Sequence, residues 1–178
     1  GDVYKRQLNA ADQIEFSGGK KNTINFEFVK GRLKARYAPS SPQATIRYFE
    51  QLSKENPSNE NKYAYLTALQ GIGDFKKALI LVDELLSKYP KNLILNITKS
   101  EIYLLAQELD KAKIQIEQVL KISPGNYPAS IIKSNILSAQ NKTIQAEEIV
   151  RELLISKNND PHLWMLLSEI QRSRSLNF

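Results

Sequence analysis

The chain has 178 residues, of which 42% are hydrophobic and 25% are charged, which is ordinary for a globular protein with a buried core. It contains no cysteine, so disulfide bonds and thiolate-bound metals are excluded. The formal net charge of +6 is modest, and solvated helix surfaces explain it better than a nucleic-acid-binding surface does. We expect no nucleic-acid partner, and no membrane span, because no apolar run approaches the roughly 18 residues of a transmembrane helix.

The first 22 residues stand apart from the rest of the chain. Residues 1–7 resemble the in-frame translation of a sequencing adapter, and we leave such an artefact out of fold reasoning. We therefore expect the natural N-terminus, with any signal peptide, to be missing. Residues 8–22 contain a polar stretch with two glycines between Ser17 and Asn22, which predicts a loop or linker.

A pair of helices is expected between residues 23 and 57. The first helix opens at Thr23, a candidate N-cap, and its apolar residues are spaced three and four apart: Phe26, Val29, Leu33 and Tyr37. A turn with two prolines, residues 39–42, separates it from a second helix over residues 43–55. Pro57 then ends the pair.

Alanines recur every 34 residues along the chain. They stand in phase at Ala44, Ala78, Ala112 and Ala146, and Pro90 and Pro124 keep the same spacing. This is the period of a tetratricopeptide repeat, which is a helix-turn-helix unit of about 34 residues. Each unit needs a small side chain where its second helix crosses the first, and a leucine there costs about 1–3 kcal/mol through overpacking. The prolines fall just past the second helices and end them.

The repeat spacing predicts an all-α fold over residues 23–178, a tetratricopeptide-repeat solenoid of about 3.5 repeats with about seven helices in antiparallel pairs and a right-handed superhelix. The units are expected over residues 23–57, 59–92, 93–126 and 127–160, followed by half a unit over residues 161–178. Asn141 replaces a turn glycine and can adopt similar backbone angles. The half unit opens with Trp164-x2-Leu167-Ser168, close to the Trp-x2-Leu-Gly of a repeat, and its lack of a second helix predicts an uncapped apolar face.

One stripe of each first helix lines the groove of such a solenoid, and helical spacing identifies it. The candidate protein-binding residues are Tyr63, Thr67, Gln70, Ile97, Glu101, Leu104, Ile131, Asn135 and Ser138. Extending the stripe outward adds Val29, Leu33, Arg36, Met165, Glu169 and Arg172. The central stripe has no basic residue, so we expect no clamp for a peptide carboxylate. Its mixed composition suits an extended or helical polypeptide or a neighbouring domain, although Ile97 and Ile131 can equally pack the groove floor.

No catalytic or metal-binding set can be assembled from this sequence. A catalytic zinc site takes about three protein ligands, usually with histidine among them, and His162 is the single histidine. The HExxH and GxSxG motifs are absent. We expect no catalytic residue, no metal site and no cofactor in this chain, and we expect His162 at the exposed start of a helix.

Several segments resemble the C-terminal region of bacterial M48-family metalloproteases of the periplasmic, outer-membrane-assembly type, the beta-barrel assembly-enhancing protease group. The resemblance covers roughly residues 24–171 and is carried by Phe26–Tyr37, Tyr48-Phe49, Tyr63-Ala64-Tyr65, Asn126-Tyr127-Pro128 and Asp160–Glu169. It implies a zinc-protease domain upstream, with HExxH and zinc in that domain only. It also implies a periplasmic location, a bacterial source, and docking to the chain's own protease domain or to outer-membrane assembly machinery.

Three functions follow as alternatives. The first is the substrate- or partner-docking region of such a metalloprotease, acting in quality control of outer-membrane protein assembly. The second is a stand-alone tetratricopeptide adaptor or scaffold in envelope assembly or secretion. The third, a nucleic-acid-binding helical repeat, rests on the positive charge alone.

Overall fold

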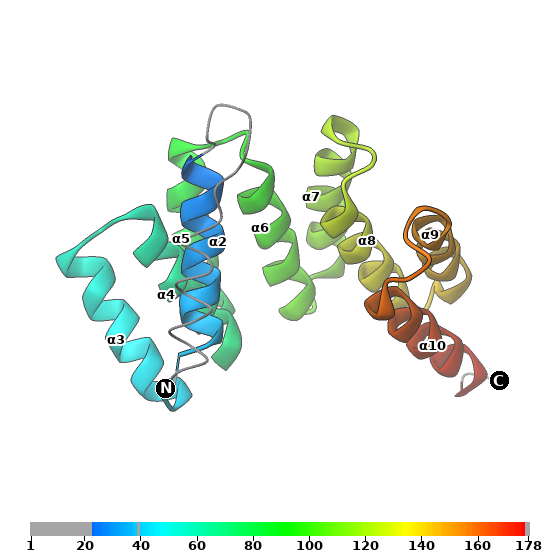
Figure 1. Ribbon diagram of the computed structural model, residues 1–178, viewed down its shortest axis with the longest axis horizontal. Helices are drawn as coiled ribbons and strands as arrows, with labels where there is room; N and C mark the ends of the chain where they lie inside the picture. The colour runs from blue at the N-terminus through cyan, green and yellow to red at the C-terminus, as the bar shows by residue number, and fades with distance from the viewer. Residues whose placement is uncertain (1–22, 39, 177–178) are drawn as a thin grey trace. The chain divides into compact units, whose positions relative to one another are not determined.

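The computed structural model describes residues 23–38 and 40–176, which form helices joined by short turns (Figure 1). The helices are α2 (Thr23–Arg36), α3 (Pro42–Glu55), α4 (Asn59–Ile72), α5 (Phe75–Lys88), α6 (Leu93–Leu105), α7 (Leu109–Ile122), α8 (Tyr127–Ala139), α9 (Thr143–Ser156) and α10 (Pro161–Leu176). No strand occurs in these residues, and the all-α prediction is confirmed. The interpretations of residues 1–7 and 8–22 lie outside the described residues.

The expected number of about seven helices is too low for the part of the chain that the structure describes. Helices α4 to α10 account for seven, as the well-matched units and the half unit predict, and α2 and α3 precede them. The predicted bounds of this first helix pair, residues 23–37 and 43–55, agree with α2 and α3 to within one residue. The error therefore lies in the total and not in the position of the helices.

Capping side chains fix where several helices begin. Ser58 accepts a hydrogen bond from the Asn61 backbone N–H at the start of α4, and Asp74 accepts one from Lys77 at the start of α5. Turns between paired helices need a left-handed residue. Gly73 is this residue between α4 and α5, with φ of 79°. Asn141 is this residue between α8 and α9, with φ of 59°, which confirms the prediction that it replaces a turn glycine.

The chain divides into two compact units, Gly1–Ile94 and Leu95–Phe178. In the described part of the first unit, α2 and α3 both pack against α4, and α2 and α4 form its most extensive helix pair. Gly31 allows this packing, because a Cβ at that position would lie 2.3 Å from the Glu60 carbonyl oxygen of α4. Any larger residue at Gly31 must push the two helix backbones apart.

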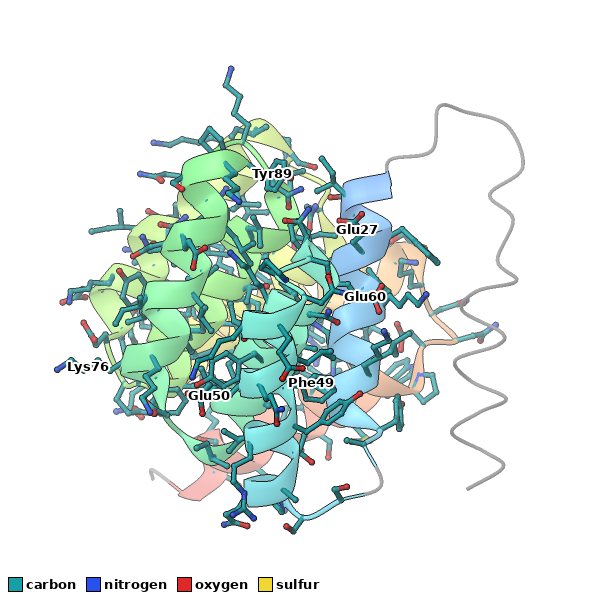
Figure 2. All side chains as sticks on the ribbon, turned by 90° about the vertical axis from the view of Figure 1, so that its left-hand side faces the viewer. Glu27, Phe49, Glu50, Glu60, Lys76 and Tyr89 are labelled. Carbon is teal, nitrogen blue, oxygen red and sulfur yellow. The ribbon has the colours of Figure 1, made fainter. Side chains whose placement is uncertain are left out.

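Polar contacts hold α2 along α4 in the first unit. Glu60 forms ion pairs with Lys34 and with Lys30, the latter at 3.9 Å, and Figure 2 shows Glu60 beside α2. At the start of α4, the Asn59 side-chain amide donates to Glu27 Oε2 at 2.8 Å and to the Tyr89 hydroxyl at 3.1 Å. The amide of Asn59 therefore links α2 to the end of α5.

The second unit is built on two helix crossings of the same design. At the α6–α7 crossing, Ser100 Oγ donates to the Ala112 carbonyl at 2.8 Å, and at the α8–α9 crossing, Ser134 Oγ donates to the Ala146 carbonyl at 3.1 Å. All four residues are fully buried. Helices α8, α9 and α10 then enclose an aliphatic core that includes Val150, Leu163, Leu167 and Ile170.

The alanine register is right at three positions and wrong at the fourth. Ala78, Ala112 and Ala146 are each the fourth residue of their helix and are fully buried. Ala44 is half-buried, and its neighbour Thr45, the fourth residue of α3, takes the buried place at 7% exposure. The cause is the start of α3, which Ser41 caps and Pro42 opens, one residue later than the repeat period requires.

Enlarging a buried alanine should destabilise the fold. We expect Ala112→Leu and Ala78→Leu each to lower the free energy of unfolding by about 1–3 kcal/mol, because neither crossing has room for a larger side chain. Lys76→Ala is the matched control, since Lys76 lies on α5 beside Ala78 and points into solvent (Figure 2). Urea titration measures both effects, and equal losses at the buried and exposed positions would contradict the register.

Candidate functional site

In the first unit, α2 covers part of the predicted binding stripe. Tyr63 is 0% exposed, its ring lies 5.2 Å from the Phe28 ring of α2, and its hydroxyl accepts a hydrogen bond from Arg32 at 2.7 Å. Thr67 and Gln70 follow on the same helix and are half-buried. Tyr63 is thus a packing residue between α2 and α4 and is inaccessible to a partner in this structure.

In the second unit, the two isoleucines of the stripe face inward. Ile97 on α6 is 9% exposed and Ile131 on α8 is 8% exposed, so they pack the floor, which is the second of the two roles their sequence positions allow. The polar and remaining apolar members of the stripe are half-buried: Glu101, Leu104, Asn135 and Ser138. Binding by these residues stays a prediction.

A hollow of about 390 Å³ lies between α8 and α10. We call it the α8–α10 hollow, and its lining residues are Asn135, Ser138, Ala139, Leu166, Glu169, Ile170, Arg172 and Ser173. Asn135 and Ser138 come from the predicted stripe, and Glu169 and Arg172 come from its outward extension. The structure therefore brings these four residues together on one surface of the second unit, while Met165, also in the extension, does not line the hollow and is 61% exposed.

Sequence reasoning missed half of this lining. Ala139, Leu166, Ile170 and Ser173 each follow a residue of the stripe or of its extension by one position on α8 or α10. A helix presents an apolar arc wider than one stripe, so counting the neighbours of each stripe residue could have found them. They matter because Leu166 and Ile170 are apolar and less exposed than Glu169 and Arg172, so they add an apolar part to a polar lining.

The rim of the α8–α10 hollow carries polar groups that the described residues leave unengaged. No hydrogen bond or ion pair within that part of the chain involves the side chains of Asn135, Glu169 or Arg172. The amide of Asn135 can donate and accept, the guanidinium of Arg172 donates, and the carboxylate of Glu169 accepts. The hollow thus offers both kinds of hydrogen-bonding group and no strong net charge.

A buried carboxylate fixes α10 on α9 and so shapes the hollow. Glu147 of α9 accepts hydrogen bonds from Gln171 at 3.0 Å and from Arg174 at 2.9 Å, both on α10. Arg151, one turn along α9, donates to the same carboxylate through Nε at 2.9 Å and through its terminal nitrogen at 2.6 Å. The hydrogen bonds from Gln171 and Arg151 hold the pKa of Glu147 below its ordinary value of 4.5.

A second contact fixes the start of α10. The Tyr127 hydroxyl at the start of α8 donates to Asp160 Oδ2 at 2.6 Å. Asp160 in turn accepts from the His162 backbone N–H at 3.0 Å, which satisfies one free donor at the beginning of α10. Burial, followed by the bond to Asp160, raises the pKa of Tyr127 to about 12, so the hydroxyl keeps its proton at neutral pH.

The described residues show no grouping suited to metal binding. Within residues 23–38 and 40–176, no three His, Asp or Glu side chains come close enough to hold a metal ion. His162 is exposed at the start of α10, as predicted. In the same part of the chain, no helix combines the length and the apolar character that crossing a membrane requires.

Comparisons with known proteins agree with this architecture. Residues 115–170 match the model of the tetratricopeptide repeat family. Residues 115–170 therefore carry tetratricopeptide repeat sequence. No curated protein matches the sequence.

Solved structures extend the likeness to most of the chain. A tetratricopeptide repeat protein from Parabacteroides merdae is 14% identical with a TM-score of 0.69, over 96% of this chain and 66% of that one. A thermophilic repeat protein of Thermus thermophilus is 21% identical with a TM-score of 0.68, over 83% of this chain and 82% of that one. MamA of Desulfovibrio magneticus is 14% identical with a TM-score of 0.54, over 88% of this chain and 98% of that one. These identities show the fold alone.

The contribution of Glu147 should appear as a pH dependence of stability. Its folded pKa lies below the ordinary 4.5, so its stabilisation is fully present above that value and is lost as the pH falls through the folded pKa. We expect the free energy of unfolding of the parent chain to fall with acidification in that range, and Glu147→Gln to flatten this part of the curve. The control is Glu148→Gln, an exposed neighbour on α9. Identical pH profiles for parent and Glu147→Gln would contradict this role.

Proposed function

We propose that the α8–α10 hollow binds an extended segment of another polypeptide. The observation that carries the proposal is that polar side chains with no partner among the described residues, those of Asn135, Glu169 and Arg172, line the same hollow as the apolar side chains of Leu166 and Ile170. A peptide backbone presents one N–H and one C=O per residue, which the Asn135 amide matches with its acceptor and donor. The tetratricopeptide repeats of the chain support a protein-interaction role.

The size and charge of the hollow define the ligand further. A volume of about 390 Å³ holds a few side chains and not a folded domain. Because the rim carries one carboxylate and one guanidinium, we expect little net electrostatic attraction and weak dependence of binding on salt. This favours a peptide over a nucleic acid, whose phosphates give a steep salt dependence.

A finer proposal rests on sequence resemblance alone. We propose that the chain is the docking region of a periplasmic M48-type zinc metalloprotease in outer-membrane protein assembly, with a stand-alone envelope adaptor as the alternative. The segment that carries most of this resemblance is residues 26–37, which supplies the α2 residues that pack on α4, including Phe28 and Gly31. The coding sequence upstream decides between the two: an HExxH motif there supports the protease, and an uninterrupted repeat array contradicts it.

The hollow can be tested by selection and substitution. Peptides selected from a random library by the parent chain should bind Asn135→Leu at least about tenfold more weakly, because leucine fills the hollow and removes its hydrogen-bonding amide. Arg172→Ala probes the other side of the rim, and Lys76→Ala in the first unit is the control. Charges at Ile97 or Ile131 would be poor probes, because both side chains are buried.

Fluorescence titration of each selected peptide against the variants measures the effect, with circular dichroism to verify folding. If the selected peptides bind Asn135→Leu and Arg172→Ala as tightly as the parent, the α8–α10 hollow is not the binding surface. Failure of the library to yield any binder would also contradict the proposal.

A further inference from the structure

One side of α10 presents a line of three chemically different side chains to the α8–α10 hollow. Leu166, Glu169 and Arg172 are spaced three residues apart on this helix, and all three line the hollow. Residues with this spacing are neighbours along one face of a helix, with about 5–6 Å between their Cβ atoms. A ligand in the hollow therefore meets an apolar group, a carboxylate and a guanidinium, in that order along α10.

The two charged side chains of this line are not paired with each other. Their spacing allows an ion pair within the helix. In the part of the chain that the structure describes, however, neither Glu169 nor Arg172 forms an ion pair or a side-chain hydrogen bond. Arg174 provides the contrast, because its guanidinium pairs with Glu147 of α9 at 2.9 Å. Helix α10 thus packs through Arg174, while the charges of Glu169 and Arg172 are available to a ligand.

An extended polypeptide has a side-chain spacing that matches this line. Alternate residues of an extended chain point to the same side and are about 6.6 Å apart, which is close to the spacing of the three side chains along α10. A segment that lies along α10 can therefore place three alternate side chains against Leu166, Glu169 and Arg172. The amide of Asn135, which lines the hollow from α8, can then bind the peptide backbone.

We propose that the α8–α10 hollow selects extended segments with an aliphatic, a basic and an acidic residue at alternate positions. The aliphatic residue contacts Leu166, the basic residue pairs with Glu169, and the acidic residue pairs with Arg172. Whichever direction the peptide runs, the basic residue is the middle one of the three. The inference rests on the extended-peptide function proposed above and adds the sequence class of its ligand.

Two fluorescent peptides of identical composition test this order. Both carry leucine, lysine and glutamate at alternate positions, with lysine in the middle of one and glutamate in the middle of the other. We expect the parent chain to bind the lysine-centred peptide about tenfold more tightly, because the other peptide brings like charges together. The charge-exchange variant, Glu169→Arg with Arg172→Glu, should reverse this preference. Fluorescence titration of both peptides against both chains measures the effect.

A second charge exchange is the matched control. Lys113→Glu with Glu117→Lys reverses an ion pair of α7 outside the hollow, leaves the net charge unchanged, and should keep the preference of the parent. In about 1 M salt, where the screening length is about 3 Å, the preference of the parent should shrink. Melting curves verify folding, which the exchange at Glu169 and Arg172 should preserve because both side chains are exposed.

The outcomes distinguish this inference from the function on which it rests. Equal binding of the two peptides by the parent, binding of neither, or an unchanged preference in the charge-exchange variant overturns the sequence class. The hollow remains a peptide site in those cases if Asn135→Leu still weakens the binding of library-selected peptides. If Asn135→Leu and Arg172→Ala weaken none of them, the proposed function and this inference fail together.

Discussion

The close crossing of two helices at a pair of small residues is the contact on which the second unit depends. At the α8–α9 crossing the Ser134 hydroxyl donates to the backbone carbonyl of Ala146 in α9. A larger side chain at Ser134 or at Ala146 would separate the two helix backbones. The bond also satisfies the hydroxyl, and no buried side-chain polar atom among the described residues lacks a partner. Packing and hydrogen bonding thus select the same residue types at these two crossings, which accounts for Ala112 and Ala146 with their spacing of 34 residues.

The first-helix face has different surroundings in the two units. In the first unit, α2 lies on α4, Gly31 permits the close approach, and Tyr63 is enclosed by Phe28 and Arg32. In the second unit, the corresponding face of α8 borders the hollow with α10, and Asn135 has no partner among the described residues. The contacts of Glu147 and Tyr127 hold α10 in place beside it. A rigid frame with unengaged polar groups is the arrangement expected of a binding site.

Period and spacing predicted the fold well because they depend on local rules. Three alanines, the turn at Asn141 and the helix positions follow from side-chain size, backbone angles and capping. The prediction that Ala44 is buried was wrong, because Pro42 sets the start of α3 and Thr45 takes the buried position instead. The burial of Tyr63 could not be predicted, because it depends on contacts with residues about thirty positions earlier. The hollow was half predicted, since spacing locates a stripe and not the floor beside it.

Nuclear Overhauser spectroscopy on a sample with labelled alanine and serine tests the helix-crossing register most directly. The account predicts cross-peaks between Ser134 and Ala146 and between Ser100 and Ala112, because each pair is joined by a hydrogen bond at a buried crossing. Cross-peaks from these serines to residues one position away, with none to the two alanines, would mean that the helices cross in another register. That result would contradict the shared crossing design.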